Sequence, residues 1–414
     1  MKLWRSQTGI FFLAVTLLAP IAGVMFDLTG IVFVAQKQGA PSALGFFVML
    51  TMLPSLLLMP FAGVLIDRYD KYVIGVWANA LRFVLTVALG LGALAGMLSP
   101  PLFYTVITLY YVLWYVSQPN MDGILKALLT PEEYLHGVSI TQAASQFGNM
   151  GAALLAGGVI ALFGIPASFF VVAGLIVVGS LCLLRLRFIH PVETPPALTT
   201  VGAYLRDLAD GFRYISATRT MVAVALMNGV LFPFYMGINV LIAPFIFRVL
   251  HGSSFTLGVV DAACGVGSII ASGLCIVLPR RERLGYTYYI LSTAALGLSL
   301  LAFTGSRSML TASLAYVAVG IFIGNMKVFA KAMLFRRADH AYIGRASSAV
   351  QMLNMGLGIV FALGAGFIGD HSLFLAYAAI IAALGCPLVL ALISALSERS
   401  EAAAREAVLV RVRP

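Results

Sequence analysis

The chain carries little charge for its length. Asp, Glu, Lys and Arg make up 10% of its 414 residues, whereas about 25% of the residues in a soluble globular chain are charged. Hydrophobic residues make up 61% of the chain. So few charges cannot cover the water-facing surface of a soluble protein of this size. The composition therefore excludes a soluble globular protein and indicates that lipid surrounds most of the chain.

Cysteine is also scarce, and the common enzyme motifs are missing. The four cysteines fall in long apolar segments without metal-type spacing: Cys182, Cys264, Cys275 and Cys386. They predict neither a disulfide framework nor a zinc site. The sequence has no His-Glu-x-x-His motif, no Gly-x-Ser-x-Gly motif and no phosphate-binding loop. We therefore expect no enzymatic activity, no cofactor and no bound metal.

Uncharged runs long enough to cross a bilayer recur along the chain. A membrane-spanning helix needs about 20 mainly apolar residues, and these runs are too long and continuous for barrel strands. The sequence therefore predicts an all-α membrane protein with twelve transmembrane helices. Their approximate limits are 8–34, 42–66, 72–97, 102–128, 138–163, 166–186, 220–249, 255–278, 286–304, 308–334, 345–369 and 372–396.

Basic residues fall mostly on one side of these predicted spans. The side with both termini carries 21 Lys and Arg residues, and the other side carries only Lys37, Arg248 and Arg307. Cytoplasmic loops hold the excess of basic residues in membrane proteins, so we expect both termini in the cytoplasm, in a bacterial inner membrane. The net charge of +10 thus orients the chain and attracts anionic lipid. We expect no nucleic-acid partner.

A segment of the chain is repeated at an offset of 205 residues. The offset pairs polar residues: Asn120 with Asn325, Gln146 with Gln351, and Asn149 with Asn354. An even number of spans separates the copies, so they run in the same direction through the membrane, as parallel repeats do. We predict two six-helix halves, 1–186 and 220–397, joined by a cytoplasmic linker with an amphipathic helix at 187–219. A cytoplasmic tail follows at 398–414.

The loop between predicted spans two and three carries Gly63, Asp67, Arg68 and Lys71. It resembles the loop signature of the major facilitator superfamily, in which this loop latches two six-helix halves in the outward-open state. The resemblance implies a secondary transporter that rocks its halves around a central site. Asp70 stands where the family has a second glycine, which resembles the macrolide-efflux and siderophore-export subgroup. That subgroup implies proton-coupled export.

Two acidic residues lie within the predicted spans. Ionisable side chains at membrane depth cost roughly 2.5–3.5 kcal/mol on insertion scales and are functional candidates. Asp27 is deep in span one, where a carboxyl group removed from water can bind and release a proton near neutral pH. Asp261 is about two turns into span eight, near Arg248 and His251. For Asp27 the alternative to proton coupling or attraction of a cationic substrate is a carboxylate that a neighbouring helix satisfies or that is hydrated near the outer surface. For Asp261 the alternative to proton coupling is a structural ion pair with these neighbours.

The repeat places opposite charges at equivalent positions. Asp122 in span four corresponds to Lys327 in span ten, and the resemblance implies that both spans line the central cavity. We predict a salt bridge between the halves that closes the cytoplasmic side and breaks when the cavity opens inward. The alternative is that each residue pairs within its own half or lies in a wet vestibule. Arg82 in span three is predicted to snorkel or to pair near the signature loop.

Two further sets of residues are candidates for the cavity. The amides either line the cavity or hold helices together: Asn120, Asn325, Gln146, Asn149, Gln351 and Asn354. The aromatic residues either stack on an amphipathic substrate or pack between helices: Tyr111, Trp114, Tyr115, Phe232, Phe234 and Tyr235.

We therefore predict a monomeric secondary transporter that exports a small amphipathic compound, either a drug-like molecule or a siderophore, in exchange for protons. Drug exporters of the superfamily usually carry a Gly-Pro pattern in span five, and residues 151–158 lack the proline. An importer or a lysolipid mover is therefore an alternative with the same fold. A non-transporting membrane sensor or scaffold is the alternative from another class, although it would not need charges on both cavity helices.

Overall fold

A computed structural model describes residues 6–68, 71–128, 134–189, 201–277, 284–337 and 343–395 of the chain. Within these ranges the chain forms helices and no strands. The predicted tail at 398–414 lies outside them. The helices are α1 (Gln7–Lys37), α2 (Pro41–Arg68), α3 (Lys71–Leu94), α4 (Pro100–Leu128), α5 (Tyr134–Ile189), α6 (Val201–Ser216), α7 (Arg219–Gly229), α8 (Leu231–Arg248), α9 (Ser254–Val277), α10 (Leu284–Thr304), α11 (Met309–Arg337), α12 (Ile343–His371) and α13 (Leu373–Ala383).

These helices supply the twelve predicted spans. Ten segments of the described chain are long and apolar enough to cross a membrane, and one of them, Phe147–Arg187, covers two predicted spans. α4 lies over the remaining predicted span, 102–128. The prediction of an all-α membrane protein with twelve transmembrane helices is therefore confirmed. The outer limits of the predicted spans agree with the helix ends to within about four residues, except that the last span, 372–396, continues past the end of α13 to Ala395.

One glycine divides α5 into two spans. α5 has 56 residues, which as a straight helix would be roughly 84 Å long, far beyond the roughly 30 Å hydrocarbon core. Gly164 has φ 82° and ψ 175°, a backbone conformation that is essentially restricted to glycine. Pro166 follows within the next turn. The helix is therefore broken between the two predicted spans, 138–163 and 166–186.

Prolines divide two other spans that the sequence predicts as single helices. α7 and α8 together form the segment Thr220–Arg248, and α13 is the first part of Leu373–Ala395. α7 ends four residues before Pro233, and α13 ends four residues before Pro387. A proline ring clashes with the carbonyl four residues earlier and cannot donate a hydrogen bond to it. A proline therefore explains each break, although the apolar pattern alone predicted one continuous helix.

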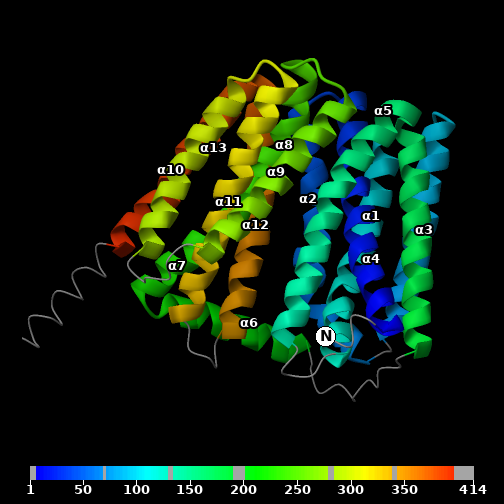
Figure 1. The fold of residues 1–414 in the computed structure, drawn as a ribbon, viewed down its shortest axis with the longest axis horizontal. Helices are drawn as coiled ribbons and strands as arrows, with labels where there is room; N and C mark the ends of the chain where they lie inside the picture. The colour runs from blue at the N-terminus through cyan, green and yellow to red at the C-terminus, as the bar shows by residue number, and fades with distance from the viewer. Residues whose placement is uncertain are drawn as a thin grey trace, which may run out of the picture.

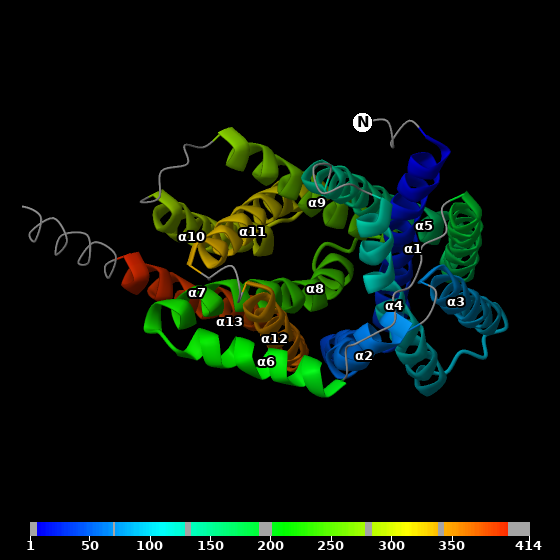
Figure 2. The same ribbon diagram turned by 90° about the horizontal axis from the view of Figure 1, so that it is seen from below.

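The membrane helices form two groups, α1–α5 and α7–α13 (Figures 1 and 2). α2 packs against α12, and α5 packs against α9, and these two pairs make most of the contact between the groups. The helix α6 and the N-terminus lie at the same end of the molecule (Figure 1), which we call the α6 end. The opposite end, where α1 finishes and α2 begins, we call the far end.

Glycines allow the two groups to meet closely near the far end. A Cβ atom added to Gly45 of α2 would lie 2.6 Å from the carbonyl oxygen of Ala362 in α12. A Cβ atom added to Gly157 of α5 would lie 2.8 Å from the carbonyl oxygen of Ser254 at the start of α9. Because neither position leaves room for a side chain, both helix pairs are in backbone contact there.

The predicted amphipathic helix corresponds to α6. Leu208 is buried, whereas Phe212 is 41% exposed on the surface. Two carboxylates on the same helix contact Arg345 near the start of α12: the Arg345 Nε–Asp207 Oδ1 distance is 2.9 Å and the Arg345 Nη1–Asp210 Oδ2 distance is 3.8 Å. α6 therefore lies across the α6 end of the second group, held by packing and by exposed ion pairs.

Candidate functional site

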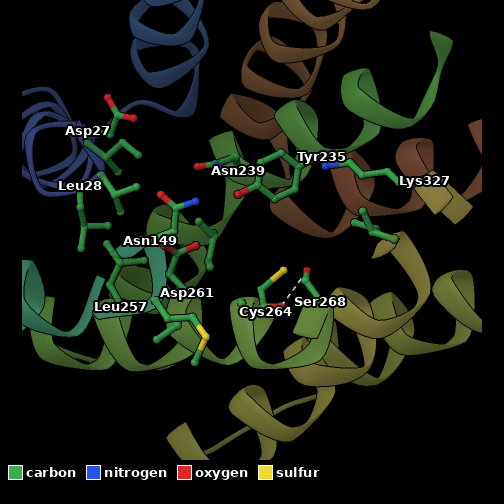
Figure 3. A pocket seen from close by; sticks show the side chains of 17 residues that line it. Asp27, Leu28, Asn149, Tyr235, Asn239, Leu257, Asp261, Cys264, Ser268 and Lys327 are labelled. Carbon is green, nitrogen blue, oxygen red and sulfur yellow. Dashed lines mark hydrogen bonds between the residues drawn. The ribbon is translucent and has the colours of Figure 1, made fainter. Parts of the chain in front are cut away.

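A cavity of about 300 Å³ lies between the two helix groups. Its wall is formed by α1 and α5 from the first group and by α8, α9 and α11 from the second. Polar and ionisable side chains on this wall are Asp27, Asn149, Tyr235, Asn239, Asp261, Cys264, Ser268 and Lys327 (Figure 3). An apolar shell of Val, Leu, Ile and Met side chains completes it. The cavity therefore gathers ionisable groups from both halves of the chain inside the membrane.

Asp27 brings an unsatisfied acceptor to this cavity. Its Oδ1 atom is buried and has no hydrogen-bond partner, and its neighbours in α1, Phe26 and Leu28, are buried apolar residues. Asp27 interacts electrostatically with Asp261 from the other group and with Arg82 from its own. A carboxylate oxygen without a donor is expensive to keep ionised in apolar surroundings. The site therefore favours either a proton on this carboxyl group or a ligand that donates to it.

Asp261 faces the same cavity from α9, about two turns after Ser254. The predicted ion pair with Arg248 is not formed, because the Arg248 guanidinium donates a hydrogen bond to the Gly39 carbonyl instead. Among the described residues, no basic side chain lies within ion-pair distance of Asp261. The two aspartates thus share one cavity although they come from opposite groups.

Arg82 is buried within the first group. It is 3% exposed, donates a 3.0 Å hydrogen bond to Asn79 Oδ1 and donates another to the Tyr110 hydroxyl. The guanidinium carbon lies 4.4 Å from the ring centroid of Tyr110 and 4.6 Å from that of Trp114. The prediction that Arg82 snorkels is therefore wrong, because aromatic faces and two polar partners hold the guanidinium inside the first group, where its Nε atom has no hydrogen-bond partner. The alternative, pairing near the signature loop, stays a prediction, because the charged side chains of that loop lie outside the described residues. The i, i+4 spacing of the two aromatic residues was the signal in the sequence.

Lys327 lies on the α11 side of the cavity. Its Nζ atom is 5.5 Å from the ring centroid of Tyr235 in α8, and its side chain is exposed to the cavity. No carboxylate among the described side chains lies within ion-pair distance of it. The side chain of Asp122, its predicted gate partner, lies outside the described residues. The gate therefore stays a prediction.

The predicted amides and the signature loop are described only in part. Asn149 lines the cavity, Asn325 is buried, Gln351 is exposed, and Asn354 has a buried Oδ1 atom without a hydrogen-bond partner. The side chains of the remaining candidates lie outside the described residues: Asn120, Gln146, Asp67, Arg68 and Lys71. Gly63 lies in the described backbone of α2.

Of the six predicted aromatic residues, Tyr235 lines the cavity and the other five do not. Tyr111 is buried, and its ring centroid lies 6.2 Å from that of Phe26 and 6.2 Å from that of Tyr115. Phe234 is buried with its ring centroid 5.1 Å from that of Phe361. Trp114 packs over Arg82, and Phe232 packs near Gly358. These rings contribute to helix packing rather than to the cavity wall.

Three cavity residues did not emerge from the sequence. Asn239 is one helical turn after Tyr235 on α8, so the two share a face. Cys264 and Ser268 follow Asp261 at spacings of three and seven along α9, which is the repeat of one helix face. This periodicity around an intramembrane aspartate was the signal that could have identified them.

Comparison with known proteins places this arrangement in a family. The family described as Major Facilitator Superfamily matches residues 6–363. The uncharacterised MFS-type transporter y4rN of Sinorhizobium fredii is 24% identical over 396 residues, covering 94% of both chains. The uncharacterised MFS-type transporter YfiS of Bacillus subtilis is 21% identical over 382 residues, covering 89% of this chain and 88% of that one.

Solved structures of transporters share the fold. A bacterial homologue of the iron transporter ferroportin in the inward-facing state superposes with a TM-score of 0.74 at 14% identity, covering 94% of this chain and 98% of that one. The nucleoside transporter NupG gives a TM-score of 0.72 at 13% identity, covering 94% and 99%. With two helix groups around one polar cavity and a family match over residues 6–363, the chain belongs to the Major Facilitator Superfamily and is an integral membrane transporter.

Proposed function

We propose that the protein exports a small amphipathic compound, either a drug-like molecule or a siderophore, in exchange for protons. Membership of the superfamily supports the transporter, and the excess of basic residues at the α6 end supports placing that end in the cytoplasm. The export direction and the substrate class are supported by the resemblance of the signature loop to that of macrolide-efflux and siderophore-export proteins. In this proposal the chain works as a monomer in a bacterial inner membrane.

The observation that supports proton coupling is the shared cavity of Asp27 and Asp261. The two carboxyl groups come from α1 and α9, which belong to different predicted halves, and both line the same cavity. Asp27 has a buried oxygen atom without a donor, and an intramembrane carboxyl group is costly when it is ionised. A proton or a cationic group of the substrate can satisfy it. Competition between the two at one site would couple export to proton entry.

Polar contacts at the far end support alternating access by rocking of the two predicted halves, 1–186 and 220–397. The Ser42 amide donates a 3.0 Å hydrogen bond to Asp370 Oδ1 of α12, and Arg248 of α8 donates to the Gly39 carbonyl. Both contacts join the first group to the second. With the far end held closed, substrate would enter from the cytoplasmic end. Whether Lys327 and Asp122 separate when the cytoplasmic end opens stays part of the proposal, because the side chain of Asp122 lies outside the described residues.

Everted membrane vesicles test the proposal. Vesicles containing the protein are energised to accumulate protons, and a pH-sensitive dye reports proton release when ethidium, an amphipathic cation, or a free siderophore is added. We expect substrate-induced proton release from wild-type vesicles and none from Asp27→Asn vesicles. Asp210→Asn serves as the control, because Asp210 is a half-exposed carboxylate on α6 that is not part of the cavity wall.

The outcomes separate the alternatives. Unchanged proton release in the Asp27→Asn variant would remove Asp27 from coupling. Release that occurs only when substrate is inside the vesicles would indicate import into the cell rather than export. Transport of either compound without any proton movement would refute coupling and leave the transporter assignment in place.

A further inference from the structure

The cavity carries opposite charges at two different depths. Asp27 is ten residues before the end of α1, and Asp261 is seven residues after the start of α9, which puts both within roughly 10–15 Å of the far end at 1.5 Å per residue. Lys327 is 18 residues after the start of α11, or roughly 27 Å from the same end. In Figure 3 Asp27 and Lys327 lie on opposite sides of the cavity. The acidic layer is therefore nearer the far end and the basic layer nearer the α6 end.

Each layer has a polar neighbour on α8 at a similar depth. Asn239 is nine residues before the end of α8, roughly 14 Å from the far end and level with the aspartates. Tyr235 is 13 residues before that end, roughly 20 Å away, and its ring lies beside the Lys327 ammonium group. The ammonium group, drawn toward Tyr235, is separated from the carboxyl groups by on the order of 10 Å along the membrane normal.

Among the described side chains, no ion pair joins the acidic layer to the basic layer. No described carboxylate lies within ion-pair distance of Lys327, and no described basic group lies within that distance of Asp261. The contact between Lys327 and the Tyr235 ring is a cation–π attraction, which does not replace a counter-ion at membrane depth. Asp27 interacts electrostatically with Arg82, yet it keeps a buried oxygen atom without a donor. Among the described residues the cavity is thus a bipolar site, with acidic and basic groups that form no ion pair with one another.

We infer that the substrate is amphoteric, with a protonated amine at the Asp27 and Asp261 end and a carboxylate, or another anion of similar size, at Lys327. This inference rests on the proposed function, because it names the substrate class of the same cavity. The two charged groups of the substrate are separated by on the order of 10 Å, as the rise per residue places the layers. An apolar middle section fits the Val24 and Ile323 side chains of the wall, which lie roughly 20 Å from the far end, between the two layers.

This inference differs from the gate hypothesis in what it requires of Lys327. A lysine that only closes the cytoplasmic side would affect transport without distinguishing one bound ligand from another. A lysine that binds an anionic group would distinguish a free acid from its ester at equilibrium, without any gradient. Binding selectivity therefore separates the two roles.

The test uses 8-aminooctanoic acid, whose amine and carboxylate are separated by seven methylene groups. Calorimetry measures its binding to full-length protein in lipid nanodiscs, beside its methyl ester, its N-acetyl derivative and the shorter 4-aminobutanoic acid. We expect the free amino acid to bind roughly tenfold more tightly than each blocked derivative, since one charge-assisted hydrogen bond is lost in each case. The shorter compound should bind roughly tenfold more weakly, because it cannot reach both layers.

Substitutions test which protein residue binds each charged group of the ligand. Lys327→Met should make the free acid and the ester bind equally, and Asp261→Asn should reduce the difference between the free amine and the N-acetyl derivative. Lys331→Met is the matched control, because it removes a lysine one turn further along the same helix, outside the cavity wall. It should preserve both differences. Thermal unfolding of each nanodisc sample verifies that the variant is folded.

The inference is overturned if the wild-type protein binds the ester as tightly as the free acid, or if Lys327→Met leaves their ratio unchanged. It is equally overturned if none of the compounds binds to folded protein. These results are independent of proton release in vesicles. Selective binding without proton release would support the amphoteric substrate and refute proton coupling. Proton release with unselective binding would support proton coupling and refute the amphoteric substrate.

Discussion

Gly45 offers a direct way to perturb the contact that closes the far end. A methyl group at this position would lie 2.6 Å from the Ala362 carbonyl oxygen and 3.3 Å from the Leu363 Cα atom. Ordinary van der Waals contact begins at about 3.4 Å. The two helices must therefore separate by roughly 0.8 Å, and both neighbouring atoms belong to backbone that cannot rotate away. Gly45→Ala should thus disfavour the state in which α2 and α12 are in contact.

The magnitude follows from the cost of overpacking. An added methyl group in a close-packed contact costs about 1–3 kcal/mol, and this free energy changes a two-state equilibrium roughly 5- to 150-fold. The strain exists only while the far end is closed, so the population open at that end should rise by this factor. In the proposed orientation the far end faces the outside of the cell.

Cys264 reports this opening, because it lines the cavity and is only 8% exposed. A membrane-impermeant thiol reagent added to intact cells should label it faster in Gly45→Ala, by the factor given above, in a background that lacks the other cysteines. The control is Gly364→Ala on α12, where an added Cβ atom meets nothing within 4 Å. A Gly45→Ala protein that is folded and labelled at the wild-type rate would refute the reasoning.

Three further predictions concern other charged residues. Asp122→Lys and Lys327→Asp should each impair transport and the double variant should recover it, measured as substrate efflux from cells; failure to recover would remove the gate pair. Arg82→Met should lower the free energy of unfolding by about 1.5–3 kcal/mol, since hydrogen bonds to a charged donor are lost, and an unchanged melting temperature in detergent would contradict this. Asp370→Ala removes the acceptor of the Ser42 amide, which should cost about 1 kcal/mol and accelerate the cysteine labelling roughly fivefold; labelling at the wild-type rate would show that this contact does not hold the far end closed.

The helical architecture could be predicted from the sequence because lipid imposes strong local rules. Backbone polar groups must be satisfied within each membrane segment, so every long apolar run had to be helical. α5 is too long to cross the membrane as one helix, so its apolar run was predicted as two spans, and the break at Gly164 lies between them. The breaks before Pro233 and Pro387 were not predicted, although the clash of a proline ring with the carbonyl four residues earlier is also a local rule.

The sequence by itself determined which residues would be costly in the membrane, since an ionisable side chain within an apolar run is visible without a structure. It named Asp27, Asp261 and Lys327 for that reason. Only the tertiary structure decided which of their neighbours they meet: it placed all three in one cavity, directed Arg248 to a backbone carbonyl and buried Arg82 among aromatic rings. Contacts between helices depend on how each helix is rotated and how closely glycines allow it to approach its neighbour, and neither quantity is contained in the apolar pattern of a single span.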